Sequence, residues 1–285
     1  GQGGCVPVAY AASLDGDADR VVFHYKRRRA AAAAADTNDA EADADAAADA
    51  AERSFRLLDG DKIAVLVTRF LQEELRALHG LGLGENLRCG VVQTAYANGA
   101  ATAYVREAVH GATVVVARTG VKYVHAAAHD NFDVGVYFEA NGHGTVLFSP
   151  AFYRMLDAAE ARLRGRYGDR ANLAWQRLRL LPSLVNQAVG DALSDLLLVD
   201  AILYLRGWSI EEWDGLYEDW PSRQCKVRVR DRSVIRTNDS ETRATAPPNL
   251  QPALDAAVAS GGGRSRCFVR PSGTENAVRV YAEAA

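Results

Sequence analysis

The chain has 285 residues, of which 48% are hydrophobic and 24% charged, and a net charge of -3. This composition is typical of a globular protein that is long enough for two or more domains. The small negative charge gives no reason to expect nucleic acid or an anionic membrane as a partner. No apolar run approaches the roughly 20 residues of a membrane span.

The four cysteines, at positions 5, 89, 225 and 267, form neither a CxxC pair nor a zinc-binding spacing. Scattered cysteines of this kind predict reduced thiols and a cytoplasmic protein. The chain begins with Gly1 and its only methionine is Met155. We therefore expect a piece of a longer product.

The first predicted elements are two strands, at 6–13 and 21–25, on either side of an acidic loop. Asp15, Asp17 and Asp19 alternate in this loop, and Arg20 follows the last of them. Alternate positions of an extended loop can turn toward one centre, and clustered carboxylate oxygens are the ligands that Mg²⁺ takes. Such a metal can hold a phosphate oxygen, and an adjacent arginine can donate two hydrogen bonds to the same phosphate.

A calcium-binding EF-hand also begins with alternating acids, and its loop is 12 residues long. Counted from Asp15, the sixth position is Arg20 where that loop needs Gly, and the twelfth is Lys26 where it needs Glu. The EF-hand is therefore excluded. A solvated acidic turn is the remaining alternative for this stretch by itself.

Residues 26–53 run from four basic residues into an alanine tract with scattered acidic residues. The stretch has no apolar period, and alanine buries too little surface to offset its ordering entropy. We predict a disordered or fraying insertion within a hairpin, without a role as a partner-binding arm.

From Asp59 onward, helices and strands are predicted in alternation. Asp59 is a predicted N-cap, and apolar residues then recur at helical spacing until Gly80. Strands are expected at 90–93, 113–117 and 134–139, with helices at 99–110 and 119–129. This alternation favours an α/β layer.

The remaining elements are mainly helical until Pro221, where the pattern changes. A charged helical stretch is expected at 152–181, and 193–205 is apolar on nearly every side, so we expect it to be buried. Ser209 and Glu212 form a predicted capping box for a short helix. Beyond Pro221, a half-buried strand near 227–230 and strands at 267–270 and 277–282 predict a small α+β domain.

The loop between the last two strands has the residues of a phosphate-binding site. Gly273 allows close approach of the backbone, Ser272 and Thr274 offer hydroxyl donors, and Arg270 and Arg279 add positive charge. A plain Ser/Gly turn between strands is the alternative.

A second candidate site follows the strand predicted at 134–139, where α/β proteins tend to place ligand contacts. The Glu139 carboxylate can accept from adjacent sugar hydroxyls, and Asn141 can both donate to and accept from an amide substituent. Gly142 and His143 complete the motif. The alternative is an Asn-Gly turn of the kind found in many hairpins.

A third candidate is the segment that begins with Thr119 and Gly120. Lys122 and His125 are three residues apart on one helical face, and either could move a proton at a sugar hydroxyl. A surface lysine and a core histidine remain the alternative for this pair.

Five motifs together resemble those of the α-D-phosphohexomutase superfamily and, within it, the phosphoacetylglucosamine mutase family. They occur in the family's order at 15–20, 90–99, 119–122, 138–145 and 268–275. They span the chain apart from 26–53. Relatives that act on glucose or mannose phosphates usually carry Ser where this chain has Asn141, which resembles the N-acetylhexosamine branch.

The resemblance implies an α/β protein with four domains around one cleft. Three domains are related α/β units, and the C-terminal one is α+β and resembles the TATA-binding-protein fold. In this chain it implies a partial second domain at 1–57, with the metal loop and the insertion, and a third, sugar-binding domain at 58–221. The phosphate-binding C-terminal domain is expected at 222–285.

The implied activity is that of an isomerase, an intramolecular phosphotransferase that interconverts N-acetylglucosamine 6-phosphate and 1-phosphate on the route to UDP-N-acetylglucosamine. A phosphoserine and a bisphosphorylated sugar take part. By analogy the three aspartates hold Mg²⁺ and Arg20 supports the transferring group. The implied substrate contacts are Thr119, Gly120, Glu139, Asn141, Gly142, His143, Arg270, Ser272, Gly273, Thr274 and Arg279. Lys122 and His125 are the candidates for proton transfer, although Tyr123 stands where relatives carry His.

The family's phosphoserine lies in a Thr-Ala-Ser-His-Asn-Pro loop, but no serine of this chain is followed by His-Asn. We therefore expect the C-terminal portion of a mutase, inactive until the missing N-terminal domains are supplied. One alternative is a phosphoglucomutase or phosphomannomutase, against which Asn141 argues. The other is a truncated, non-catalytic module that binds hexosamine phosphate.

Overall fold

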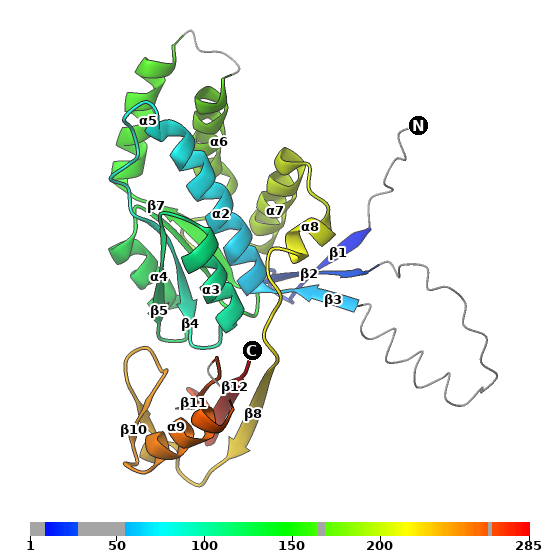
Figure 1. Ribbon diagram of the computed structural model, residues 1–285, viewed down its shortest axis with the longest axis vertical. Coiled ribbons are helices and arrows are strands. Elements are labelled where there is room, and N and C mark those ends of the chain that lie inside the picture. Colours follow the sequence, from blue (N-terminus) through cyan, green and yellow to red (C-terminus); the bar gives the residue numbers. More distant parts are fainter. Residues whose placement is uncertain (1–8, 28–54, 165–168, 262–263) are drawn as a thin grey trace, which may run out of the picture.

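The computed structural model describes residues 9–27, 55–164, 169–261 and 264–285. The chain forms a four-stranded sheet, and a three-stranded sheet carries the first strands. Figure 1 shows the larger sheet covered by helices, the first strands beside it and a smaller C-terminal unit that carries the last strands. The fold is mixed α/β, as the sequence predicted. Most of the predicted insertion at 26–53 lies outside the described residues, as do residues 1–8. None of the described helices is both long and apolar enough to cross a membrane.

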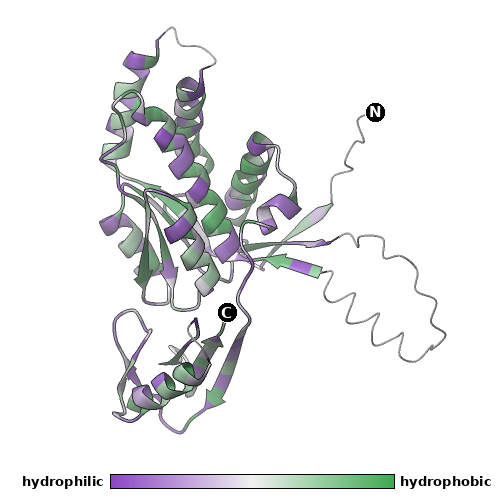
Figure 2. Ribbon diagram, viewed as in Figure 1, coloured by the Kyte–Doolittle hydropathy of each residue, from purple (hydrophilic) through white to green (hydrophobic). Residues whose placement is uncertain are grey.

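The four-stranded sheet has the order β5-β4-β6-β7, in which β4 pairs in parallel with β5 and β6, and β7 is antiparallel to β6. Its strands are β4 (Cys89–Thr94), β5 (Ala112–Ala117), β6 (Val134–Phe138) and β7 (Gly144–Phe148). Every residue of β4 and β6 is buried, because helices cover both faces of the sheet. Figure 2 shows hydrophobic residues concentrated in these strands.

Helices pack on both faces of this sheet, because successive residues of each strand point to opposite faces. Val91 and Val136 face the main core with the long helix α2, whereas Val92 and Tyr137 pack in a second cluster with Val124 of α4. The helices are α2 (Gly60–His79), α3 (Gly99–Ala108), α4 (Val121–Asn131), α5 (Pro150–Leu163), α6 (Arg170–Leu184), α7 (Ala192–Arg206) and α8 (Ile210–Asp214). The charged stretch expected at 152–181 is thus divided between α5 and α6.

Both predicted caps are present. The Asp59 side chain accepts hydrogen bonds from the amides of Asp61 and Lys62 at the start of α2. Ser209 and Glu212 form a capping box at the start of α8.

The three-stranded sheet carries the acidic loop, which contains Asp15, Asp17 and Asp19, between its first two strands. Its strands are β1 (Tyr10–Leu14), β2 (Val21–Lys26) and β3 (Phe55–Leu58), all antiparallel in the order β1-β2-β3. Val21, Phe23 and Tyr25 of β2 face the core. There the rings of Phe23 and Trp213 pack in a T-shaped arrangement, with their centres 5.2 Å apart. The outer strand β1 is largely exposed, and residues 6–8 of the strand predicted at 6–13 lie outside the described residues.

The C-terminal unit is α+β, as predicted. Its main sheet has the order β11-β12-β8 and is antiparallel, and α9 packs on β11. Its elements are β8 (Ser222–Arg228), the 3₁₀ turn η1 (Arg232–Val234), β9 (Arg236–Thr237), β10 (Ala244–Ala246), α9 (Leu250–Ser260), β11 (Arg266–Pro271) and β12 (Ala277–Glu283). The prediction of a half-buried strand at 227–230 was wrong. The strand β8 begins earlier and, because it lies at the edge of the sheet, is exposed along its whole length.

The prediction of burial for 193–205 was also wrong. The segment forms α7, but Leu193 is 59%, Leu197 55% and Tyr204 86% exposed. The helix lies at the periphery: it packs against α2, β2 and α6, while Leu193, Leu197 and Tyr204 are on its exposed side. Apolar residues all round a helix therefore did not mean burial all round.

Candidate functional site

A cleft of about 580 Å³ lies where the two sheets and the C-terminal unit meet. It is lined by Val22, Leu57, Asp59, Thr94, Tyr96, Thr119, Glu139, Ala140, Asn141, Gln224, Arg270 and Arg279. We call residues 139–145 the sugar loop and residues 272–276, between β11 and β12, the phosphate loop, after their predicted roles. The sugar loop and the arginines on either side of the phosphate loop thus line one cavity, although more than 120 positions separate them in the sequence. The acidic loop lies beside it, since Asn141 also lines a smaller hollow together with Asp15 and Arg20.

The acidic loop gathers its three carboxylates. One oxygen from each of Asp15, Asp17 and Asp19 lies within 4.8 Å of the others. This span is close to the roughly 4.2 Å that separates opposite oxygen ligands around Mg²⁺. Oδ1 of Asp19 has no hydrogen-bond donor among the described residues. A donor set of three carboxylates with an unsatisfied oxygen fits a hard divalent cation.

Hydrogen bonds inside the loop fix this arrangement. Asp15 Oδ1 accepts from the amides of Asp19 and Arg20, both at 3.2 Å. Arg20 Nε lies 3.6 Å from Asp15 and 3.5 Å from Asp19. Desolvation alone would raise the pKa of Asp15, but the two amides and the Arg20 charge outweigh it and lower that pKa. Asp15 is therefore held as a carboxylate, the form that binds a metal.

The sugar loop is attached directly to the acidic loop. The Val21 amide donates to the Gly142 carbonyl at 3.2 Å, and His143 Nδ1 lies 3.1 Å from Asp19 Oδ2. Gly142 has a φ of 88°, and a Cβ there would lie 2.0 Å from the Val21 carbonyl oxygen. Only glycine fits this contact. The Asn-Gly turn that was the alternative interpretation is thus present, and it also joins this loop to the acidic loop.

Glu139 and Asn141 line the cleft, and one oxygen atom of each side chain is hydrogen-bonded within the protein. Glu139 Oε1 accepts from the Gly120 amide at 3.1 Å, and the Asn141 side-chain oxygen accepts from the His143 amide at 3.0 Å. The second Glu139 oxygen and the Asn141 amide nitrogen have no partner among the described residues. These are an acceptor and a donor that a sugar derivative could use.

The two residues predicted for proton transfer lie elsewhere. Lys122 is exposed and its Nζ lies 4.8 Å from the centre of the Tyr123 ring. His125 Nδ1 is hydrogen-bonded to the Tyr137 hydroxyl at 3.1 Å, in the cluster under α4. Neither lines the cleft, whereas Thr119 of the same segment does. Their role in proton transfer stays a prediction.

The phosphate loop connects β11 to β12. Arg270 and Arg279 face each other in the register of these strands, and both line the cleft. Ser272 is buried, and its amide donates to the Ala277 carbonyl at 2.8 Å. A Cβ at Gly273 would have no atom within 4 Å, which leaves the backbone there open to a ligand. Thr274 is exposed beside it.

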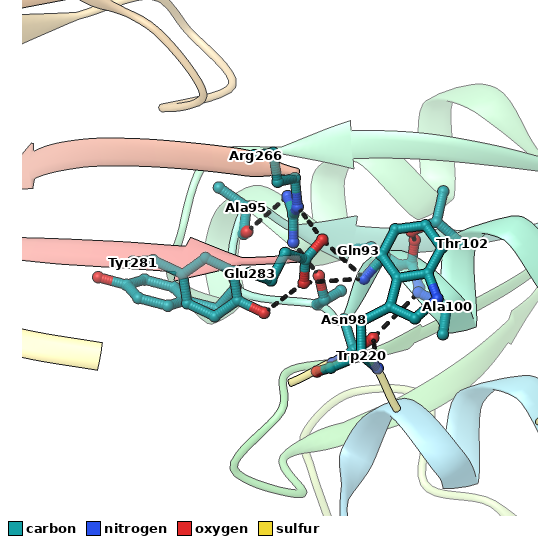
Figure 3. A network of polar contacts seen from close by, with 12 residues as sticks. Gln93, Ala95, Asn98, Ala100, Thr102, Trp220, Arg266, Tyr281 and Glu283 are labelled. Carbon is teal, nitrogen blue, oxygen red and sulfur yellow. Dashed lines mark hydrogen bonds and ion pairs between the residues drawn. The ribbon is translucent and has the colours of Figure 1, made fainter. Parts of the chain in front are cut away.

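A polar network fixes the C-terminal unit against the α/β body, as Figure 3 shows. The Glu283 carboxylate accepts from the Gly99 amide at 3.1 Å, and Arg266 pairs with Glu283 and donates to the carbonyls of Ala95 and Ala97. Asn98 exchanges hydrogen bonds with the Trp220 backbone at 3.0 and 3.1 Å. These contacts hold the strands that carry Arg270 and Arg279 against the segment that follows β4.

Four residues of the cleft wall that have polar side chains were not among the predicted site residues: Asp59, Thr94, Tyr96 and Gln224. Asp59 was recognised only as a helix cap, and Thr94 and Tyr96 belong to the motif at 90–99, which had received no role. Burial, together with the Asp219 charge, raises the pKa of Asp59 to about 6. A carboxylate with a raised pKa at a cleft wall was a signal that sequence could not give.

Comparisons with known proteins show which family the chain is similar to. Residues 59–208 match the family model "Phosphoacetylglucosamine mutase AMG1, domain III", and residues 225–285 match "Phosphoglucomutase/phosphomannomutase, C-terminal domain". The chain is 47% identical over 96% of its length to the phosphoacetylglucosamine mutase of Arabidopsis thaliana, and 46% identical over 95% to that of Homo sapiens. It covers 45% and 44% of those proteins, so it spans about half the length of the relatives it matches.

A solved structure shows the same fold over the whole chain. The Aspergillus fumigatus N-acetylphosphoglucosamine mutase, in complex with GlcNAc-6P and magnesium, superposes with a TM-score of 0.80 at 40% identity. The match covers 100% of this chain and 47% of that one. By its sequence and its fold, the chain belongs to the phosphoacetylglucosamine mutase family.

Proposed function

We propose that this chain forms the sugar- and phosphate-binding part of a mutase that interconverts N-acetylglucosamine 6-phosphate and 1-phosphate. The observation that carries the proposal is the single cleft. It joins a sugar-type acceptor, Glu139, and an amide donor, Asn141, to two facing arginines, Arg270 and Arg279. The product of the forward reaction would serve the formation of UDP-N-acetylglucosamine.

Each group has a distinct task in this proposal. Glu139, Asn141 and His143 orient the sugar, and the Asn141 amide nitrogen donates to the carbonyl of the N-acetyl group. Arg270 and Arg279 hold the phosphate that is not reacting, with donors from the loop of Ser272, Gly273 and Thr274. Thr119 and Gly120 form the wall between the two sites.

The acidic loop would hold Mg²⁺ through Asp15, Asp17 and Asp19. When bound, the ion would neutralise charge on the phosphoryl group that is transferred. Arg20 lies against two of the three aspartates and would present its remaining N–H groups to that phosphoryl group. Magnesium in the complex of the Aspergillus relative supports this assignment.

The phosphoryl donor would come from outside these 285 residues. No serine here is followed by His-Asn, and the chain matches less than half of its relatives' length. We propose that the chain alone binds the sugar phosphate and does not turn it over. Catalysis then requires a phosphoserine that an additional segment supplies.

The test measures binding and turnover separately. N-acetylglucosamine 6-phosphate should bind the 285-residue chain in a titration calorimeter with Mg²⁺ present, and turnover should occur only in a version extended toward the N-terminus to the length of the relatives. Turnover by the 285 residues alone would contradict the missing donor. Absence of binding would contradict the site itself.

A specificity test separates this proposal from a glucose or mannose phosphate mutase. Asn141→Ser should weaken binding of N-acetylglucosamine 6-phosphate by about tenfold, since one hydrogen bond to the acetamide is lost. Binding of glucose 6-phosphate should change much less. An equal effect on both ligands would show that Asn141 does not read the acetamide.

A further inference from the structure

Glu241 is a buried carboxylate that connects the two halves of the cleft. It lies in the loop between β9 and β10, and it is 4% exposed. Its Oε2 accepts from the Thr119 amide at 3.1 Å and lies 3.2 Å from Arg270 Nε. Its Oε1 lies 3.4 Å from Arg118 Nε. Glu241 does not itself line the cleft, but two of its three contacts, Thr119 and Arg270, do.

The loop around Glu241 is built to hold this side chain inward. Glu241 has a φ of 58°, a conformation that costs a residue other than glycine free energy. Its amide donates to the Asn238 carbonyl at 3.0 Å, and the Asn238 side-chain oxygen accepts from the amides of Thr242 and Arg243 at 3.0 and 3.1 Å. Side-chain hydrogen bonds therefore stabilise a strained turn that has Glu241 at its centre.

The contact with Arg270 leaves most of the guanidinium available. A guanidinium has five N–H donors, and Glu241 faces only the one on Nε. The contact is ionic, because Nε lacks the alignment of a hydrogen bond. Tyr96 also contacts Arg270, as a hydrogen-bond partner and through its ring, whose centre lies 5.7 Å from the guanidinium carbon. The remaining N–H groups are left for a contact with phosphate.

Glu241 also fixes the part of the cleft wall that Thr119 forms. The consecutive amides of Thr119 and Gly120 donate to two different carboxylates, Glu241 from the C-terminal unit and Glu139 from the sugar loop. The position of this wall therefore depends on both loops. A side chain that holds both the wall and the arginine sets the distance between the two ligand-binding groups.

We propose that Glu241 is a positioning residue, which orients Arg270 and the Thr119 backbone for the phosphate of the substrate. The inference rests on the proposed function, since it concerns the same ligand. It predicts that removal of the Glu241 charge weakens phosphate binding, whereas charge repulsion alone predicts that binding becomes tighter. A negative charge near bound phosphate should weaken binding by repulsion, so its removal should tighten binding unless the carboxylate is needed to orient Arg270.

The experiment compares Glu241→Gln with the unaltered 285-residue chain by titration calorimetry with N-acetylglucosamine 6-phosphate. Glutamine removes the charge and keeps the size of the side chain. We expect binding to weaken about tenfold, the lower end of the loss when an orienting partner of a ligand contact is removed. Asp239→Asn is the matched control, because Asp239 is exposed in the same loop and loses the same charge. It should bind as the unaltered chain does.

A double variant shows whether Glu241 acts through Arg270. In an Arg270→Ala background, Glu241→Gln should cause a clearly smaller further loss of binding than in the unaltered chain, because only the Thr119 contact is then left to lose, whereas a general loosening of the fold would cause the same loss in both backgrounds. If Glu241→Gln does not fold, Glu241→Asp replaces it and should bind with an intermediate affinity. Unchanged or tighter binding in the single variant would overturn the inference. Absence of binding by the unaltered chain would instead contradict the proposed function.

Discussion

Arg270 lies directly opposite Arg279 in the antiparallel pair of β11 and β12. Lys226 of β8 lies opposite Arg279 on its other side, so three cations follow one another across the sheet. Glu241 pairs with Arg270 and Glu275 with Lys226. No described carboxylate lies within ion-pair distance of Arg279. Like charges that face each other across strands are destabilising, which indicates that this row is arranged for an anionic ligand.

Replacement of the central arginine should separate binding from stability. In Arg279→Met, we expect N-acetylglucosamine 6-phosphate to bind at least about tenfold more weakly, since a charge-assisted contact with phosphate is lost. The free energy of unfolding in urea should stay constant or rise by up to about 1 kcal/mol, because the repulsion is relieved. Arg228→Met, on the exposed edge strand, is the control and should keep the affinity. A large loss of stability in Arg279→Met would contradict this account.

The glycine that joins the two loops should tolerate no side chain. Gly142→Ala places a Cβ 2.0 Å from the Val21 carbonyl at a positive φ, so the loops must separate. We expect a loss of stability of about 2 kcal/mol or more, and a loss of substrate binding. Gly16→Ala is a control within the acidic loop, because a Cβ there meets no atom within 4 Å. Thermal unfolding and calorimetry measure both variants, and equal behaviour of the two would refute the steric argument.

Metal binding by the acidic loop can be tested without loosening the loop. Asp15 accepts the hydrogen bonds that shape the loop, whereas Asp17 is exposed and makes no hydrogen bond with a described residue. Asp17→Asn should therefore weaken binding of Mn²⁺, detected by electron paramagnetic resonance, by about tenfold through the loss of one charged ligand. Asp130→Asn, on an exposed part of α4, should have no effect. If Asp17→Asn binds Mn²⁺ unchanged, the three carboxylates do not share one ion.

A buried aspartate in α7 should make the stability depend on pH. Burial, and then the charge of Asp191, raise the pKa of Asp195 to about 8. In the native state Asp195 keeps its proton up to about pH 8, whereas in the unfolded chain it ionises near pH 4. Unfolding therefore releases a proton in this interval, and stability falls as the pH rises from 4 to 8.

Asp195→Asn should remove this dependence and unfold at higher urea concentration at pH 8. The expected gain is on the order of 2 kcal/mol or more, since each unit of pKa shift is worth about 1.4 kcal/mol. Asp157→Asn, whose side chain is 78% exposed, is the control and should leave the pH profile unchanged. A gain that is the same at pH 5 and pH 8 would show that the charge of Asp195 is not the cause.

Much of the fold could be read from local patterns. The helix that begins after Asp59 and the capping box at Ser209 were predicted, because a cap and an apolar period are local properties of the sequence. The burial of α7 could not be predicted, because exposure depends on which elements pack against a helix. Leu197 is apolar and more than half exposed for this reason.

Residue types and their spacing specify the chemical groups of the candidate site: alternating carboxylates, a Glu-Ala-Asn-Gly-His loop and an Arg-Pro-Ser-Gly-Thr loop. Which of these groups share a cleft depends on how the chain packs. The tertiary structure brought Arg270 to the wall that contains Glu139, left His125 against Tyr137, and placed Glu241 between Thr119 and Arg270. The physical reason is that residue type fixes what a side chain can donate or accept, whereas its partners depend on packing between elements distant in the chain.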